Sequence, residues 1–238
     1  MGRNFDFPSN PALLLYTDPP DGYASVSMVD LGYFGCSMSS LPEPGSLDSL
    51  LAAPYMPFDG MNEKGLVIGM AAIPESVSPR REGNTLIGEI QVVRLMLDRA
   101  ADVEEALRLL GEYDVEMMTP PIHYMLANAE GNSVIIEFID GHMHLVREPT
   151  GYQVMTNFIV HGSGAPEDSP CWRYNAVHDG LSMCGGAVSA TEAIGLLSDS
   201  SQSSTIWSTV YCPATGEIHV AMGADFETAH TFTLNMTR

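Results

Sequence analysis

Four polar residues have types and positions that could do chemistry. Arg173 follows a loop and opens a predicted helix, where the helix dipole disfavours a cation, so its side chain is expected to point at an anionic group. Asn157 ends a predicted strand, where its side-chain amide and its backbone N–H could both donate to an oxyanion. Arg3 and Asp6 lie close together at the start of the chain.

The pair Arg3 and Asp6 has two interpretations. Successive side chains of a strand point to opposite faces, so Asn4 and Asp6 would share one face and Arg3 and Phe5 the other. The two charges therefore diverge, unless a twist or a bulge re-aims one of them. Taken alone, the segment is equally typical of a solvated chain terminus whose charges do little.

Two further groups could carry chemistry. His142 and His144 share one face of a predicted strand and could hold a metal, but no acidic or cysteine partner stands nearby at ligand spacing, so a hairpin strand with a wet polar side is favoured. Cys171, His178 and Asp179 could mimic a thiol-protease triad, although one helical stretch holds them at a loose spacing. No Walker loop, GxGxxG, HExxH or GxSxG motif occurs. The sequence thus predicts neither a cofactor nor a metal.

The charge balance argues against some partners. The 238 residues include 10 basic and 30 acidic side chains, a formal net charge of −20, which disfavours nucleic acid and anionic membrane surfaces. The 4 cysteines lie far apart, as is typical of thiols kept reduced. Neither an export signal nor an apolar run of membrane-spanning length is visible. We therefore expect an acidic cytoplasmic protein.

Apolar periodicity and capping residues predict the elements. Asp102 with Glu105, and Ser189 with Glu192, mark two helix starts, and Ser46 is a candidate cap for one or two helical turns. Strands are predicted over residues 12–16, 25–33, 66–72, 123–128, 133–139, 142–147, 152–157, 204–211, 217–222 and 229–234, helices over 86–99, 103–110, 172–181 and 191–197, and a tight connection over 59–65.

This order of elements predicts the fold class. Strand blocks separated by grouped helices indicate α+β with antiparallel meanders, and not the alternation of a parallel sheet. Two sheets packed between two helical layers would use every element. No repeat or long linker divides the sequence, so residues 1–238 are expected to form one domain.

Four segments, taken together, resemble one enzyme superfamily. In chain order they are Gly-Arg-Asn-Phe-Asp-Phe (2–7), Asp-Gly-Met-Asn-Glu-Lys-Gly-Leu (59–66), Val-Met-Thr-Asn (154–157) and Ser-Pro-Cys-Trp-Arg-Tyr (169–174). Over nearly its whole length the chain resembles the choloylglycine hydrolase superfamily of linear amide C–N hydrolases. That group includes bile salt hydrolases, penicillin V acylases and acyl-CoA:6-aminopenicillanic acid acyltransferases. The resemblance implies the four-layer αββα sandwich of N-terminal-nucleophile hydrolases.

The resemblance also implies roles for the four polar residues. In that superfamily an N-terminal cysteine attacks the amide carbonyl, with its own α-amino group as the base. By resemblance, Arg3 lies beside the thiolate and lowers its pKa, and Asp6 orients the amino group. Asn157 is similar to the asparagine of the oxyanion hole, and Arg173 to the second arginine of the polar network. Asn62, within the second segment, is interpreted as a turn-fixing residue.

The chain departs from the superfamily pattern in two places. The superfamily's nucleophile lies one strand and turn before the Gly-Arg-Asn segment, whereas this sequence starts at Met1, directly before it. The nucleophile is therefore expected upstream of Met1, and the sandwich would then lack its first strand. Ala72 stands where bile salt hydrolases have an asparagine, which argues against bile-salt specificity.

Two functions follow. The first is hydrolysis of a small-molecule acyl amide, or acyl transfer from it, through a covalent acyl-cysteine intermediate. The second is a small-amide-binding or assembly protein on the same scaffold, without catalysis. The loops at 37–57 and 75–85 are apolar enough for a hydrophobic acyl chain. An unpaired strand edge beside residues 2–7 would favour self-pairing, so a homo-oligomer is expected.

Overall fold

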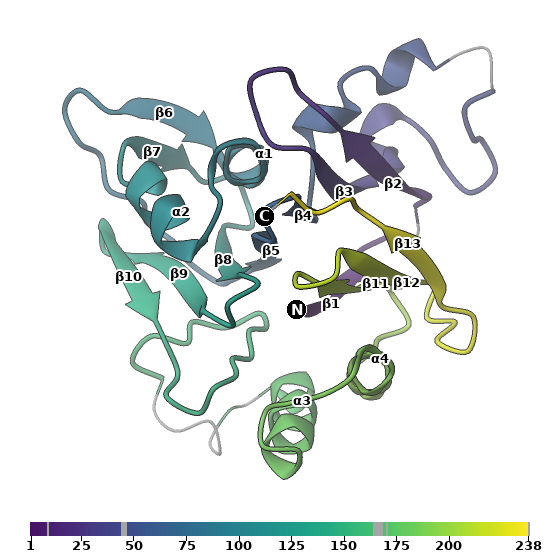
Figure 1. Cartoon of the computed structure of the whole chain (residues 1–238). Coiled ribbons are helices and arrows are strands. Elements are labelled where there is room, and N and C mark those ends of the chain that lie inside the picture. Colours follow the sequence, from purple (N-terminus) through teal and green to yellow (C-terminus); the bar gives the residue numbers. More distant parts are fainter. Residues whose placement is uncertain (9, 44–46, 164–168, 170, 238) are drawn as a thin grey trace.

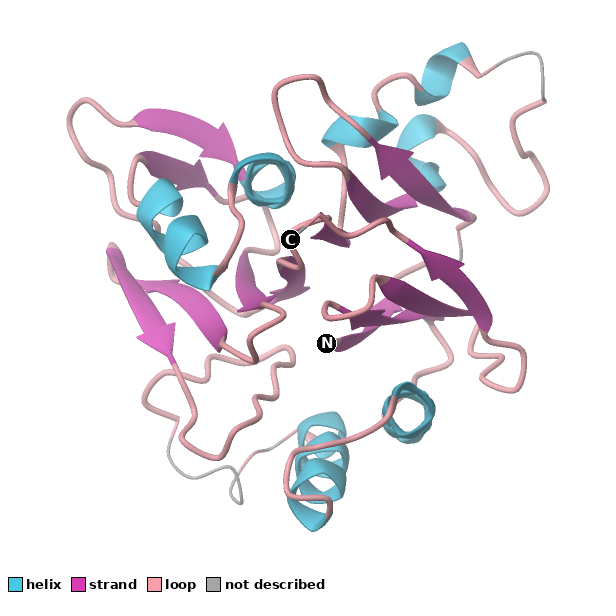
Figure 2. Cartoon of the chain, in the orientation of Figure 1, coloured by secondary structure: helices cyan, strands magenta, loops and turns pink. Residues whose placement is uncertain are grey.

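Two antiparallel β-sheets form the inner layers of the structure (Figure 1, Figure 2). The computed structural model describes residues 1–8, 10–43, 47–163, 169 and 171–237. Within these residues, a seven-stranded sheet has the order β10 (His142–Val146), β9 (Ser133–Ile139), β8 (Ile122–Ala127), β5 (Val67–Ala72), β4 (Asp59–Asn62), β3 (Ser25–Asp30) and β2 (Ala12–Thr17). A four-stranded sheet has the order β1 (Gly2–Asp6), β11 (Thr205–Cys212), β12 (Glu217–Met222) and β13 (His230–Thr233).

Helices cover the outer faces of both sheets. Helix α1 (Glu89–Arg99) packs on β4 and β5 of the larger sheet and is followed by α2 (Val103–Leu110). Helix α4 (Ala190–Asp199) packs on β1 and β11 of the smaller sheet, and α3 (Trp172–Met183) lies against α4. In Figure 1 the pairs α1–α2 and α3–α4 lie on opposite sides of the two sheets. The predicted αββα arrangement is confirmed.

A cluster of buried apolar side chains joins the two sheets. Trp207 of β11 is fully buried and stacks on Phe5 of β1, with ring centroids 3.9 Å apart. Phe58, directly before β4, packs edge-on against Phe5 at 5.1 Å. The Met1 side chain packs closely over Gly69 of β5, where an added Cβ would lie 2.8 Å from it. The start of the chain is therefore held inside the molecule.

Local signals predicted the starts of α2 and α4. The Asp102 carboxylate accepts a hydrogen bond from the Glu105 N–H at 2.8 Å. Ser189 and Glu192 form a reciprocal capping box. Both caps are confirmed, whereas Ser46 lies outside the described residues. In the described part of the chain, no helix has the length and apolar character needed to cross a bilayer.

Three predicted elements were wrong. Helix α1 begins at Glu89, because residues 85–88 instead form β6 (Thr85–Gly88), a strand parallel to β7 (Tyr113–Glu116), which was not predicted. Residues 152–157 form no strand. The predicted connection over 59–65 contains a whole buried strand, β4, and only its last residues turn.

The strand predicted over residues 25–33 ends early, at Asp30. That carboxylate accepts a hydrogen bond from the Gly32 N–H at 2.7 Å and so caps a short 3-10 helix, η1 (Leu31–Phe34). The Asp30 side chain therefore starts a helical turn at a point where the prediction continued the strand.

Asn62 fixes the turn that follows β4. Its side chain is fully buried, and its Oδ1 atom accepts hydrogen bonds from the N–H groups of Lys64 (3.1 Å) and Leu66 (3.0 Å). Its Nδ2 atom donates to the carbonyl groups of Leu97 (3.1 Å) and Ala100 (2.7 Å) at the end of α1. The turn-fixing role predicted for Asn62 is confirmed, and the same side chain also ties α1 to the sheet.

Replacing Asn62 by alanine is expected to lower the free energy of unfolding by about 2–4 kcal/mol. The change leaves two buried carbonyls, the buried N–H of Leu66 and the partly buried N–H of Lys64 without their partner, and each buried loss costs roughly 1–3 kcal/mol before relaxation. Urea unfolding followed by circular dichroism measures the effect. The control is Asn132→Ala, because the Asn132 side chain is partnered by the exposed Glu130 carboxylate at 3.4 Å. Equal losses for both variants would contradict the role of Asn62.

Candidate functional site

A buried carboxylate, Asp59, lies where the two sheets face each other. Arg3 of β1 donates from Nη1 to Asp59 Oδ2 at 2.9 Å, and also to the carbonyl of Phe58. From β11, Trp207 Nε1 donates to Oδ2 at 3.1 Å, and the Tyr211 hydroxyl donates to Oδ1. Asp59 thus receives three side-chain donors from the smaller sheet. Sequence reasoning missed it, although an acidic residue beside a buried strand was a usable signal.

Burial and the charge of Asp59 shift the pKa values of the side chains that bind it. Burial lowers the pKa of the Arg3 guanidinium, and the nearby Asp59 and Asp6 carboxylates oppose that shift. Burial and Asp59 raise the pKa of the Tyr211 hydroxyl well above its usual range, so it remains a donor. The Arg3 side chain is 10% exposed and that of Asp59 is 0% exposed. This is a true buried ion pair and not a solvated terminus.

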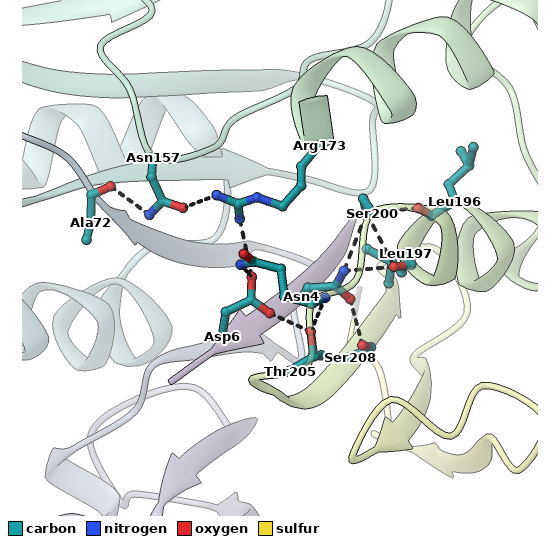
Figure 3. Close-up of polar contacts among 11 residues, drawn as sticks. Asn4, Asp6, Ala72, Asn157, Arg173, Leu196, Leu197, Ser200, Thr205 and Ser208 are labelled. Atoms are coloured by element: carbon teal, nitrogen blue, oxygen red, sulfur yellow. Dashed lines mark hydrogen bonds and ion pairs between the residues drawn. The ribbon is translucent and has the colours of Figure 1, made fainter. Parts of the chain in front are cut away.

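A second network connects β1, α3 and the loop after β10 (Figure 3). Arg173 Nη1 donates to Asp6 Oδ2 at 3.2 Å, and Arg173 Nη2 donates to Asn157 Oδ1 at 2.8 Å. Asn157 in turn donates from Nδ2 to the carbonyl of Ala72, the last residue of β5, at 2.8 Å. The expectation that Arg173 points at an anionic group is confirmed. Three of the four predicted site residues form one continuous chain of contacts.

Asp6 has further partners on the smaller sheet. Thr205 Oγ1 donates to Asp6 Oδ1 at 2.5 Å, and Gln202 Nε2 donates to Asp6 Oδ2 at 2.6 Å. The register of β1 against β11 shifts between Phe5 and Asp6, so a bulge does occur where a re-aimed charge required one. Arg3 and Asp6 nevertheless diverge, because Arg3 pairs with Asp59 and Asp6 pairs with Arg173.

Asn4 anchors β1 to the helical layer beneath it. Its Nδ2 donates to the carbonyl of Leu197 at 2.8 Å, and its Oδ1 accepts from the Ser208 hydroxyl at 2.6 Å (Figure 3). Asn4 thus faces α4 while Arg3 faces the sheet interface, as the alternation of a strand predicts.

A buried histidine–glutamate pair holds the loop that carries Asn157. His123 Nδ1 lies 2.9 Å from Glu137 Oε1, and its Nε2 lies 2.8 Å from the carbonyl oxygen of Thr156. Each ring nitrogen of His123 therefore faces an oxygen atom of a different partner. Glu137 also accepts from the N–H groups of Val160 and His161, each at 2.8 Å. The segment predicted as a strand is therefore fixed by side chains instead of by a sheet ladder.

The electrostatics of Glu137 favour this arrangement. Burial by itself would raise the pKa of Glu137, but the hydrogen bonds from His123 and from the two loop N–H groups lower it below its usual value. The carboxylate is therefore charged when it holds the loop. The pair lies on β8 and β9, so two strands of the larger sheet position Asn157.

Cys171 lies directly before α3, two residues from Arg173. Burial alone would raise the pKa of the Cys171 thiol. The Thr156 hydroxyl and backbone N–H groups at the start of α3 outweigh burial, and the Arg173 charge adds to them, so the pKa is lowered. In contrast, burial raises the pKa of Cys212. Cys171 is thus the more readily ionised thiol of the two.

The other candidate groups are not assembled. His178 Nε2 faces the Tyr152 hydroxyl at 3.3 Å, and no contact joins His178 to Cys171 among the described residues, so the thiol-protease triad does not form. His142 Nδ1 bonds to the carbonyl of Asp140, and His144 stacks on His161 with ring centroids 4.0 Å apart. A cavity of about 290 Å³ beside α1 contains none of the four predicted site residues in its lining.

Removing the Arg3 charge is expected to destabilise the fold strongly. Arg3→Met leaves the buried Asp59 carboxylate without its cation, a loss of roughly 3–5 kcal/mol in the free energy of unfolding. The double variant Arg3→Met/Asp59→Asn removes the orphan charge and should recover part of that loss. Chemical unfolding of the unmodified chain, Arg3→Met, Asp59→Asn and the double variant measures the coupling.

The matched control for this pair is an exposed one. Arg147 Nη2 lies 2.6 Å from Glu104 Oε1, with side chains 41% and 73% exposed. Arg147→Met should change stability by less than about 1 kcal/mol, since solvent screens such pairs. If Arg3→Met costs no more than Arg147→Met, Asp59 does not depend on the ion pair.

Known proteins share the sequence pattern and the fold. Residues 54–237 match the family model of acyl-coenzyme A:6-aminopenicillanic acid acyl-transferase. Penicillin V acylase of Pectobacterium atrosepticum is 32% identical over 111 residues, which cover 42% of this chain and 29% of that protein, well under two thirds of its length.

Solved structures agree on the architecture. The structure of penicillin V acylase from Agrobacterium tumefaciens matches with a TM-score of 0.63 at 21% identity, covering 93% of this chain and 78% of that one. A mutant conjugated bile acid hydrolase from Clostridium perfringens matches with a TM-score of 0.67 at 15% identity, covering 98% and 88%. The chain therefore has the αββα fold of N-terminal-nucleophile hydrolases and belongs to the acyl-coenzyme A:6-aminopenicillanic acid acyl-transferase family.

Proposed function

We propose that the protein hydrolyses linear amides of small molecules, or transfers their acyl group, through an acyl-cysteine intermediate. The nucleophile is a cysteine in a segment that precedes residue 1. The contact chain from Asp6 through Arg173 to Asn157 carries the proposal, because it gathers charged and amide groups from three distant parts of the chain. Family membership supports the reaction class.

The residues divide into anchors and chemical groups. Arg3 is anchored by Asp59 and supplies positive charge that favours a thiolate nearby. Asp6 orients the α-amino group of the nucleophile. Arg173 holds Asp6 and Asn157 in place. Asn157 donates one Nδ2 hydrogen to the Ala72 carbonyl. Its second hydrogen and nearby backbone N–H groups donate to the oxyanion.

The proposed reaction needs no cofactor. The thiolate sulfur forms a bond to the amide carbonyl carbon, and the oxyanion collapses as the C–N bond breaks. The α-amino group passes the thiol's proton to the leaving amine. Water then attacks the thioester and releases the acid, or an acceptor amine takes the acyl group. The cysteine regains its proton in either branch.

The substrate class is an acyl amide with an apolar acyl chain. The loop at 37–57 carries large apolar side chains that are more than half exposed, namely Met38, Leu41, Leu51 and Tyr55. These four side chains offer an apolar surface to a hydrophobic acyl group. Penicillin V is the first compound to assay, since the curated relative is a penicillin V acylase.

A small-amide-binding protein without catalysis is the second candidate. It is favoured by the completeness of the Asp6 network. Both Asp6 oxygens already have donors in Arg173, Gln202 and Thr205, with no thiol or ligand required. On this alternative, Asn157 and Arg173 recognise an amide or acid group and leave it intact.

The decisive experiment compares two proteins, the 238-residue chain and the same chain preceded by its native upstream residues. We expect hydrolysis of penicillin V or another N-acyl amide only from the longer protein, after processing exposes its cysteine. Asn157→Ala should lower kcat/KM by about 10²–10³-fold, the usual effect of losing an oxyanion donor. Liquid chromatography of the released acid measures turnover.

Two controls make the result readable. Cys184→Ser removes an exposed thiol and should leave turnover unchanged. If the 238-residue chain itself turns over substrate and Cys171→Ser abolishes this, the nucleophile lies inside the chain and the upstream assignment is wrong. If the upstream frame contains no cysteine, serine or threonine that can become N-terminal, the binding protein is the remaining candidate.

For the 238-residue chain we also propose a homo-oligomer that pairs through β1. Met1 and Tyr211 exchange both backbone hydrogen bonds (2.8 and 2.9 Å), so by alternation the backbone groups of Gly2 and Asn4 point away from β11. Strand β1 is the last in its sheet among the described residues. Gly2→Pro should shift the protein from dimer to monomer in analytical ultracentrifugation, because proline removes an outward donor. A monomeric unmodified chain would contradict the proposal.

A further inference from the structure

We propose that Cys212, Glu217 and His219 form a binding site for Zn²⁺. One ligand atom from each residue lies within 4.8 Å of the other two. Among the described residues, no other group of three histidine, cysteine or acidic side chains meets this condition. A thiolate, a carboxylate and an imidazole are the ligand types that zinc takes in proteins.

The hairpin between β11 and β12 places these ligands. Cys212 and Glu217 are directly opposed across the two strands, and His219 is two residues further along β12 on the same face. The turn between them is closed by hydrogen bonds from the Thr215 and Gly216 N–H groups to the Cys212 carbonyl (3.1 and 2.9 Å). The turn and the strand register together set the spacing of the three ligands.

His219 supplies an independent indication of a ligand. Its Nδ1 atom lies 3.1 Å from the Thr231 hydroxyl on β13, which fixes the orientation of the ring. Its Nε2 atom is buried and has no hydrogen-bond partner within the described part of the chain. A buried ring nitrogen without a partner is costly, and metal coordination would satisfy it. Zinc-binding histidines commonly hold their second nitrogen in this way.

The surroundings suit a metal with an open position. Cys212 packs at the edge of the apolar cluster of Ile194, Leu197 and Val210, which keeps water away from the sulfur side. Glu217 is exposed, so a metal ion can enter from its side. Ligands of tetrahedral zinc lie roughly 3.5 Å apart, so the exposed Glu217 side chain has to move only slightly. Three protein ligands leave the fourth position to water.

The site would stabilise the smaller sheet by linking β11 to β12. Tyr211, next to Cys212, pairs with Met1 and also donates to Asp59. A metal at the end of this hairpin would therefore stabilise β11, the strand that pairs with β1 and so positions Arg3 and Asp6. The metal would take no part in the acyl chemistry. The inference does not depend on the proposed function.

Zinc binding to the full chain tests the proposal. Titration against a chromophoric chelator should show one Zn²⁺ per chain, and zinc should raise the thermal unfolding temperature. Bound zinc should protect Cys212 from alkylation, as read by mass spectrometry, while the exposed Cys184 stays reactive. Co²⁺ in place of Zn²⁺ should give a sulfur-to-cobalt charge-transfer band.

Variants separate this site from other sources of binding. Cys212→Ser should abolish the cobalt band, and His219→Gln should weaken Zn²⁺ binding by more than about 100-fold. Thr231→Val should weaken it by about 10-fold to 100-fold, as loss of an orienting hydrogen bond does. His144→Gln alters the separate cluster of His142, His144 and His161 and should leave Zn²⁺ binding unchanged. No binding by the unmodified chain, or binding lost in His144→Gln and kept in Cys212→Ser, would overturn the proposal.

Discussion

The interaction on which the rest of the structure depends is the buried carboxylate of Asp59. An ionised carboxylate without partners inside a protein costs several kcal/mol, so its donors have to be in place whenever the chain is folded. Those donors come from β1 and β11, whereas Asp59 belongs to the other sheet. The charge therefore fixes the register of one sheet on the other. The stacked rings of Phe5 and Trp207 pack beside it and fill the same interface.

The contacts of Asp6, Arg173 and Asn157 depend on this alignment of the two sheets. Once β1 is held by Arg3, the side chain of Asp6 reaches the start of α3, where Arg173 meets it. Asn157 completes the line because the buried His123–Glu137 pair fixes its loop from the larger sheet. Neither pair is a catalytic group by itself. Together they bring groups from both sheets and from α3 to one place, which the proposed reaction at an amide carbonyl requires.

Several features of this protein follow from short stretches of sequence. The caps at Asp102 and Ser189, and the turn bonds of Asn62, are made within a few residues, so residue types alone predict them. The errors occur where the partner is distant. Leu86 fits the helical period of α1, but β7 pairs with its segment as a strand. The segment at 152–157 alternates like a strand, but Glu137 and His123 take the place of a neighbouring strand.

The sequence by itself determined the α+β class, the starts of α2 and α4, the family pattern and four polar residues as candidates for the site. Only the tertiary structure decided their partners: Arg3 belongs to Asp59, and Asp6 belongs to Arg173. The physical reason is range. Caps and turns are local hydrogen bonds, whereas a charge pair between two sheets exists only after the sheets have packed.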